Sequence, residues 1–201
     1  MNIHLNIHAH DFGDLLLLGL GRKYGIIYAD PPWPFRTWSA KGRDRSPDKH
    51  YSEMTLQDLA ALPVRDLADN PCVLALWVPW ANLPDAIWLA GMWGFKYSTC
   101  GFVWHKLTAG GMSWMKKGYT TRQSTECCLF FKPHKGAMPK VRCHNLDQFV
   151  ERLGAARHSE KPTVFMDRLE MLFGDVARVE LFARKTRPGW DAMGRQLDLA
   201  K

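Results

Sequence analysis

Short apolar runs alternate with amphipathic segments along most of this chain. The run CVLALWVP at 72–79 is continuously apolar, which is typical of a strand buried on both faces of a sheet. Runs rich in β-branched and aromatic residues predict further strands at 24–29, 97–106, 126–132 and 178–184. Apolar residues that recur at helical intervals predict helices over 55–62, 83–94 and 161–173. Strands that alternate with helices in this order predict an α/β fold, a three-layer α/β/α sandwich around a mostly parallel sheet.

Capping and breaking residues set the ends of these helices. Thr55 and Asp58 have the spacing of a helix N-cap, and Pro63 ends the same segment. Gly94 stops the second helix, and Pro162 suits the first turn of the third. These signals bound each predicted helix independently of its apolar pattern.

The length and composition are those of a folded protein built as one domain. With 201 residues, 46% apolar and 23% charged, the chain can bury a substantial core, and we expect a single domain over 1–201. The apolar stretch LLLLGL at 15–20 is too short to span a bilayer and is preceded by Asp11 and Asp14. We therefore expect a cytoplasmic protein with no membrane partner.

The net charge indicates the class of binding partner, and the cysteines and histidines indicate whether a metal site is expected. The formal net charge of +7 at pH 7 favours a polyanion such as nucleic acid. The five cysteines include no CxxC pair, and the histidines are scattered through different segments. We expect reduced thiols and no metal site.

The segment DPPW at 30–33 stands directly after the predicted strand at 24–29. Ligands of α/β sheets bind at the carboxyl ends of strands, so Asp30 is a candidate site residue. Pro31 and Pro32 leave a stiff segment with carbonyl acceptors, and Trp33 adds a flat apolar face. Two acceptors beside such a face suit a planar ring with an exocyclic amino group, such as adenine. A strand end with a proline turn and a core tryptophan explains the same residues, so the motif alone leaves both interpretations open.

Lysines and arginines mix with aromatic residues in three segments that follow predicted strands. Such mixtures suit a phosphate backbone and stacked bases, although a solvated charged face explains any one of them. In the first two segments the candidate nucleic-acid contacts are Arg36, Lys41, Arg43, Arg45, Lys116, Lys117, Tyr119 and Arg122. The third segment carries Lys132, Lys135 and Lys140. We expect all three segments at the same edge of the sheet.

Several motifs have a characteristic order: DPPW at 30–33, GFVWHK at 101–106, GYTTRQSTECCLF at 118–130, HSEKP at 158–162 and VELFARKTRPGWDAMGRQLD at 179–198. In that order and spacing they resemble the MT-A70 family of S-adenosylmethionine-dependent N6-adenine methyltransferases, which act on RNA or DNA. The resemblance covers residues 24–198. It implies a Rossmann-like methyltransferase fold in which the catalytic motif precedes the main cofactor segment. That order fits the lack of a glycine-rich fingerprint after the first strand.

The resemblance implies roles for the residues of the DPPW motif. Asp30 and the backbone carbonyl of Pro31 would accept hydrogen bonds from the adenine amino group. Pro32 stiffens the motif, and Trp33 helps to wall the pocket.

The resemblance also implies contacts to the cofactor, S-adenosylmethionine. Lys161 would contact its methionine carboxylate, and Glu180 its ribose hydroxyls. Further cofactor contacts would fall on Arg184, Thr186, Arg195 and Gln196, where Thr186 stands in place of a histidine and Arg195 in place of an asparagine. Lys106 and Glu126 match motif positions that shape the site or contact substrate, and a structural ion pair explains each equally well.

The function we favour is a DNA N6-adenine methyltransferase, because the chain is short and carries no appended RNA-binding module. An RNA N6-adenine methyltransferase, an N4-cytosine methyltransferase and a catalytically silent nucleic-acid-binding subunit are the alternatives. The intact DPPW motif argues against the silent subunit, and Trp33 argues against the cytosine enzyme. A homodimer and a heteromeric partner both stay open.

Overall fold

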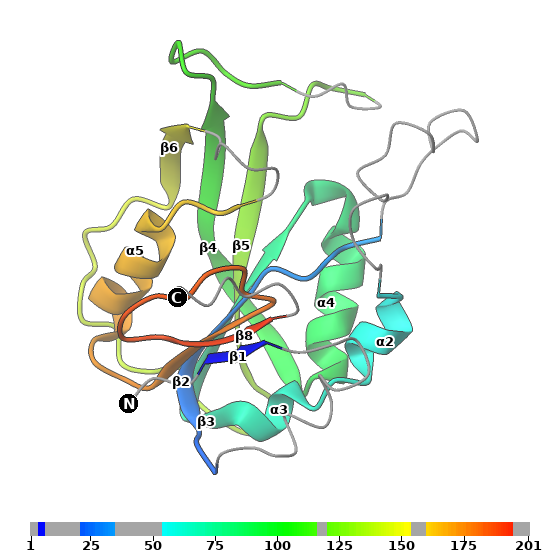
Figure 1. Cartoon of the computed structure of the whole chain (residues 1–201), viewed down its shortest axis with the longest axis vertical. Helices are drawn as coiled ribbons and strands as arrows, with labels where there is room; N and C mark the ends of the chain where they lie inside the picture. Colours follow the sequence, from blue (N-terminus) through cyan, green and yellow to red (C-terminus); the bar gives the residue numbers. More distant parts are fainter. Residues whose placement is uncertain (1–3, 7–20, 35–53, 116–119, 154–159, 195–201) are drawn as a thin grey trace.

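A computed structural model of the chain describes residues 4–6, 21–34, 54–115, 120–153 and 160–194. In these residues eight strands form one sheet with the spatial order β1-β8-β7-β2-β3-β5-β4-β6 (Figure 1). Neighbouring strands are parallel, except that β5 runs antiparallel to both β3 and β4. In sheet order the strands are β1 (His4–Asn6), β8 (Asp191–Gly194), β7 (Arg178–Leu181), β2 (Tyr24–Ala29), β3 (Ala68–Val78), β5 (Thr125–Pro133), β4 (Phe95–Leu107) and β6 (Phe149–Leu153).

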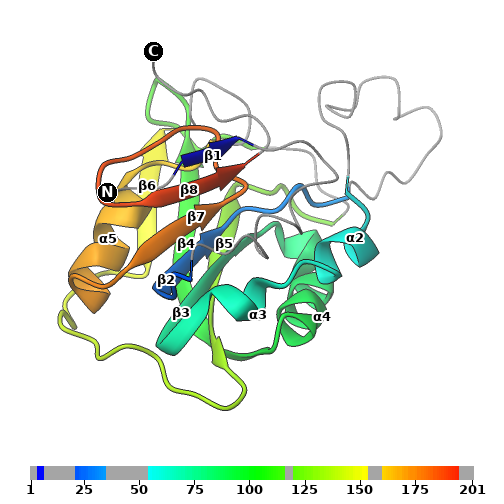
Figure 2. The same cartoon turned by 60° about the horizontal axis from the view of Figure 1, so that its bottom comes forward.

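Helices cover both faces of the sheet. Figure 2 shows α5 (Val164–Phe173) on the opposite side of the sheet from the other helices. Those helices are α2 (Leu56–Ala60), α3 (Val64–Leu67) and α4 (Leu83–Met92), with the short 3₁₀ helix η3 (Trp80–Asn82) leading into α4. The three layers confirm the α/β/α sandwich expected from the sequence. No helix within the described ranges is long and apolar enough to cross a membrane.

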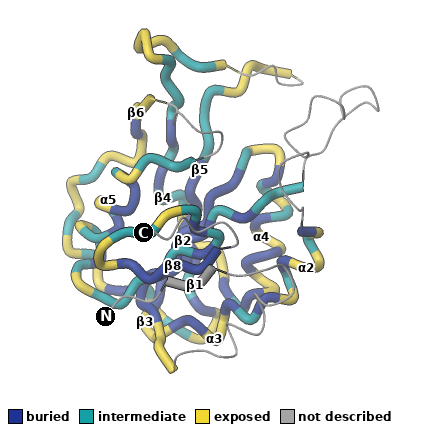
Figure 3. Tube along the Cα trace, viewed as in Figure 1, coloured by how far each residue is buried: buried dark blue, intermediate teal, exposed yellow. Residues whose placement is uncertain are grey.

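The core divides into two clusters because side chains alternate across the strands. On β2, Ile27 and Ala29 pack in the cluster that contains the residues of α2, α3 and α4. Ile26 and Tyr28 pack in the other cluster, with Phe165 of α5. Every residue of β2 is buried, and β3 is buried from Cys72 onward (Figure 3). The central strands are therefore covered on both faces, as their continuous apolar runs predict.

Local signals were accurate for the central elements. The strand expected at 24–29 is β2, with the same bounds. The expected cap is a full capping box, in which Asp58 N donates to Thr55 Oγ1 at 3.1 Å and Thr55 N donates to Asp58 Oδ2 at 3.0 Å. The elements that the sequence did not predict are the short ones: β1, β6, β8, α3 and η3.

The five cysteines are free thiols, as expected. Cys72, Cys127 and Cys128 are buried in the strands. Burial raises the pKa of Cys72 and of Cys127 to about 12, so these thiols stay protonated at neutral pH.

The direction of β5 decides which segments meet at the active edge of the sheet, the edge where β2, β3 and β4 end. Because β5 is antiparallel, its first residues lie at this edge, with Thr125 opposite His105 and Glu126 opposite Trp104. Its last residues lie at the other edge, where Lys132 pairs with Lys96. The expectation that all three basic segments share one edge is therefore wrong for the segment with Lys132, Lys135 and Lys140. An apolar run does not reveal strand direction.

We expect Gly194→Ala to lower the free energy of unfolding by about 1–3 kcal/mol. A Cβ on Gly194 would collide with the backbone carbonyl of Ala183, and a backbone atom cannot rotate away as a side chain can. Urea unfolding followed by circular dichroism measures the change. Gly91→Ala on α4 is the matched control, because its Cβ would meet nothing within 4 Å. That variant should gain up to about 1 kcal/mol. A Gly194→Ala protein as stable as the wild type would contradict the close approach.

Candidate active site

Asp30 lies directly after β2, at the centre of the active edge. Ala29 before it pairs with Leu76 of β3 on one side and with Leu181 of β7 on the other. The side chain of Asp30 is 24% exposed, so one side of it faces solvent. This is the position at the carboxyl end of a central strand that the sequence predicted.

Two hydrogen bonds hold the rest of the DPPW segment in place. The backbone N–H of Trp33 donates to the carbonyl of Pro31 at 2.8 Å, which closes a three-residue turn. The indole Nε1 of Trp33 donates to the carbonyl of Trp77 on β3 at 2.8 Å. A carbonyl oxygen has two lone pairs, so the Pro31 oxygen keeps one for a further donor.

A chain of alternating charges runs from Asp30 across the active edge. Lys161, which precedes α5, places its Nζ 2.6 Å from Asp30 Oδ2 and 3.4 Å from Glu126 Oε2. Lys106 at the end of β4 pairs with the other oxygen of Glu126. The ion pair considered for Lys106 and Glu126 therefore exists, and it adjoins the site. Four segments far apart in the sequence supply these four groups.

Burial and the neighbouring charges together set the pKa values of Asp30, Lys161 and Glu126. Burial raises the pKa of Asp30, and Lys161 offsets that effect only in part. Burial alone would lower the pKa of Lys161, but Asp30 and Glu126 outweigh it and the pKa is raised. Burial would raise the pKa of Glu126, yet Lys161 and Lys106 outweigh it and hold the pKa below its usual value. Lys161 and Glu126 are thus charged at neutral pH.

Tryptophan rings lie close to both lysines of this series of charges. Lys161 Nζ lies 5.4 Å from the centroid of the Trp77 ring, within the range of a cation–π contact. Lys106 Nζ lies 4.6 Å from the Trp104 ring and 5.6 Å from the Trp114 ring. Sequence reasoning gave Trp77 no role, although it stands in the quoted run CVLALWVP.

Glu180 on β7 presents a second carboxylate on the same face as Tyr28, its neighbour on β2. Burial, and then the nearby charge of Asp30, raises the pKa of Glu180 to about 7, with Arg187 opposing the shift. In the described part of the chain no hydrogen bond or ion pair engages this carboxylate. A partly buried acceptor without a donor suits a ligand that brings hydroxyl groups.

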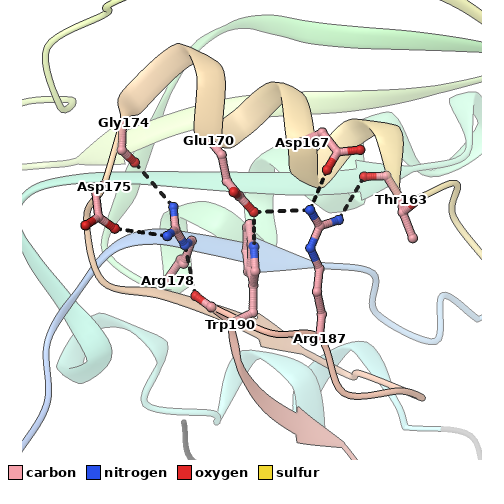
Figure 4. A network of polar contacts seen from close by, with 9 residues as sticks. Thr163, Asp167, Glu170, Gly174, Asp175, Arg178, Arg187 and Trp190 are labelled. Atoms are coloured by element: carbon pink, nitrogen blue, oxygen red, sulfur yellow. Dashed lines mark hydrogen bonds and ion pairs between the residues drawn. The ribbon is translucent and has the colours of Figure 1, made fainter. Parts of the chain in front are cut away.

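A polar network ties the segment after β7 to α5 (Figure 4). The guanidinium of Arg187 donates to the carbonyl of Thr163 at 3.2 Å and to Glu170 Oε1 at 3.3 Å, and it also pairs with Asp167. Trp190 Nε1 donates to the same oxygen of Glu170 at 2.7 Å. The segment thereby runs past the start of α5, which Lys161 precedes.

Two of the predicted cofactor residues, Arg184 and Thr186, lie on this tethered segment. Its first residue, Phe182, has a φ of 63°. Such a value is uncommon for an aromatic residue and clusters at functional sites. Lys185 Nζ pairs with Glu160 at 2.7 Å, which adds a further link to the residue before Lys161.

The remaining candidates are not brought together by the described residues. Arg122 is described and exposed, in the segment before β5. Nine candidates lie outside the described residues, namely Arg36, Lys41, Arg43, Arg45, Lys116, Lys117, Tyr119, Arg195 and Gln196. Among the described residues no three histidine, cysteine or acidic side chains are grouped to hold a metal ion.

Comparisons with known proteins agree with this geometry. The MT-A70 family model matches residues 24–196. The type II methyltransferase M.MunI of Mycoplasma sp is 31% identical over 192 residues, which cover 88% of this chain and 78% of that protein. The mouse N(6)-adenine-specific methyltransferase METTL4 is 23% identical over 193 residues, or 90% of this chain and 39% of METTL4.

A third relative, from Medicago truncatula, is the putative N(6)-adenosine-methyltransferase MT-A70-like. It is 28% identical over 184 residues, which cover 87% of this chain but only 26% of that protein. The chain thus spans most of M.MunI and well under half of the other two relatives. The family match over most of its length shows that this chain belongs to the MT-A70 family of S-adenosylmethionine-dependent adenine-N6 methyltransferases.

Proposed function

We propose that this enzyme methylates the exocyclic amine of adenine in DNA, with Asp30 and the Pro31 carbonyl as the acceptors that hold the amine. The observation that carries the proposal is the position of Asp30, at the carboxyl end of β2 with a charged Lys161 2.6 Å away. The type II methyltransferase name of the relative with 31% identity favours DNA as the substrate. The name of the Medicago truncatula relative refers to adenosine and supports RNA as the alternative.

The donor groups on the active edge fit the cofactor. S-adenosylmethionine combines an amino-acid carboxylate with ribose hydroxyls, and it supplies a methyl group bound to a positively charged sulfur. Lys161 offers a buried cation for the carboxylate. Glu180 offers a carboxylate that no described group bonds, which suits the hydroxyls. Arg184 and Thr186 lie on the segment beside Lys161 and would complete the contacts.

The acceptors explain how a weak nucleophile is activated. The lone pair of the adenine amine is delocalised into the ring, so the amine reacts poorly. Asp30 and the Pro31 carbonyl would each accept one N–H and favour a pyramidal nitrogen with a localised lone pair. Positive charge builds on this nitrogen as it takes the methyl group, and the fixed carboxylate of Asp30 stabilises it. The nitrogen then releases a proton. The hydrogen bond from Trp33 to the Trp77 carbonyl and the turn from Pro31 to Trp33 keep the acceptors oriented.

A single-domain architecture, a cytoplasmic location, and a homodimer or heteromeric partner stay predictions from the sequence. None of them is needed for the chemistry just described.

We expect Asp30→Asn to lower methyl transfer by at least about 100-fold, because the neutral amide no longer stabilises the charge on the nitrogen. Tritium transfer from labelled S-adenosylmethionine to duplex DNA, single-stranded DNA and RNA, followed by nucleoside analysis, measures both rate and product. Asp69→Asn, an exposed residue at the other end of β3, should keep wild-type activity. Wild-type rates for Asp30→Asn would refute the assignment. A methylated nucleoside other than N6-methyladenine would refute the proposed reaction.

Cofactor affinity should depend on Glu180. Since its pKa is about 7, the carboxylate is mostly charged at pH 8 and mostly protonated at pH 6. Calorimetric titration should show the affinity for S-adenosylhomocysteine falling about tenfold from pH 8 to pH 6. Glu180→Gln should bind weakly at both pH values and remove the dependence. A variant that keeps the wild-type pH profile would exclude Glu180 from the cofactor site.

Glu180 should also lower the free energy of unfolding of the enzyme without bound cofactor. The pKa of Glu180 is raised above its unfolded value of 4.5, so the folded state holds the proton more tightly and stability falls as pH rises from about 4.5 to 7. At pH 8 Glu180→Gln should therefore raise the free energy of unfolding by roughly 1–3 kcal/mol, and at pH 4 it should have no effect. Urea unfolding at the two pH values tests this. A gain of equal size at both would point to packing instead of charge.

A further inference from the structure

Three aromatic rings form a row across the sheet at the active edge. Trp80 is the first residue of η3, two residues beyond the end of β3 at Val78. Its Nε1 donates to Thr125 Oγ1 at 2.8 Å. Thr125 pairs with His105 of β4, and the His105 ring lies 5.6 Å from the ring of Phe149 on β6 with a tilt of 33°. We call Trp80, His105 and Phe149 the aromatic row.

The aromatic row faces the same side of the sheet as α4. Cys127 belongs to the core cluster on the α4 side, and side chains alternate along a strand, so Thr125 on β5 lies on that side and Trp80 reaches it through the hydrogen bond to Thr125 Oγ1. Trp104 belongs to the opposite cluster, which places its neighbour His105 with them. Figure 1 shows β4 and β5 continuing past the end of α4. His105 near the end of β4 and Thr125 at the start of β5 belong to this part of the two strands.

Trp80 and Phe149 are exposed, whereas the side chain of His105 is only 16% exposed and is held by hydrogen bonds. Trp80 is 41% exposed and Phe149 is 52% exposed, so a ligand can reach both rings. His105 is held on both sides, with Nδ1 2.9 Å from Glu151 Oε1 and Nε2 2.8 Å from Ser113 Oγ. Rings that are ordered before a ligand arrives lose little entropy on binding, so such rings are suited to a partner with flat faces.

The row adjoins the catalytic residues. Thr125 directly precedes Glu126, and His105 directly precedes Lys106, the two residues of the charged chain that extends from Asp30. Three strand spacings separate β3 from β6, a distance of about 14 Å. Successive stacked or splayed bases of a strand that enters the site can cover such a span. The net charge of +7 attracts the phosphates of that strand.

We propose that the aromatic row is the surface on which unpaired bases flanking the target adenine stack. This inference builds on the proposed function. The partner is the substrate strand itself, and the row adds affinity without distinguishing its base sequence. Stacking on aromatic side chains is sequence-tolerant, since every base has a π face. The row would therefore favour single-stranded nucleic acid, or a duplex opened around the target, over an intact duplex.

The test compares two tryptophans of similar exposure. Trp80→Leu should weaken the binding of a labelled single-stranded adenine-containing DNA at least fivefold, as measured by fluorescence anisotropy. Trp88→Leu on the outer face of α4 is the matched control, because Trp88 is 44% exposed and is not part of the row. Phe149→Leu should act in the same direction as Trp80→Leu, and Trp80→Phe should restore most of the affinity. The slope of log K against log salt should not change, since no phosphate contact is lost.

Further readouts separate this inference from the proposed function. S-adenosylhomocysteine should bind Trp80→Leu as it binds the wild type. Equal DNA affinities for Trp80→Leu, Trp88→Leu and the wild type would overturn the aromatic row while methyl transfer to DNA still supported the function. The aromatic row would also be overturned if Trp80→Leu changed only the self-association of the protein in sedimentation and left its DNA affinity unchanged. A wild-type enzyme that neither binds nor methylates DNA or RNA would refute the proposed function as well.

Discussion

The burial of Asp30 at the edge of the sheet is the constraint on which the site depends. A carboxylate largely removed from water favours its protonated form unless a cation compensates. Lys161 compensates at 2.6 Å, but a buried ammonium group is itself costly without further anions. Glu126 supplies the next anion, and Lys106 balances it. The reversed direction of β5 makes this possible, because it brings the start of that strand to the edge where β2 and β3 end.

Trp77 connects this charged chain to the rest of the fold. Its carbonyl accepts the indole N–H of Trp33, and its own Nε1 donates to the hydroxyl of Tyr28 at 2.7 Å. Its ring meets Phe165 of α5 edge-on, with centroids 4.7 Å apart, while Lys161 lies over it. The same residue thus positions the DPPW segment and the helix that Lys161 precedes. A buried tryptophan in a central strand is more than core volume here, since each polar atom it offers is used to fix the site.

Sequence patterns predicted the parts of this structure that depend on neighbours in the chain. The bounds of β2, the capping box at Thr55 and the position of Asp30 directly after a strand all follow from local spacing. Strands β1, β6 and β8 were missed because they have three to five residues, too few for a periodic signal. The pairing of Lys161 with Asp30 joins residues 131 positions apart, and only the fold brings them together. The family resemblance named both residues but did not imply that they touch.

Several features that cost folding free energy lie at the active edge. Glu180 keeps a carboxylate that its surroundings push toward protonation, and Phe182 holds a backbone conformation with φ of 63°. Trp80 and Phe149 leave apolar rings in water. A neutral residue in place of Glu180, a glycine in place of Phe182 and polar residues in place of Trp80 and Phe149 would suit the folded chain by itself better. Costs of this kind persist where a ligand offsets them, by donating to the carboxylate, covering the rings or requiring the unusual turn. Glu180 and Phe182 at the end of β7, Trp80 beyond β3 and Phe149 at the start of β6 therefore outline the proposed surface for cofactor and substrate.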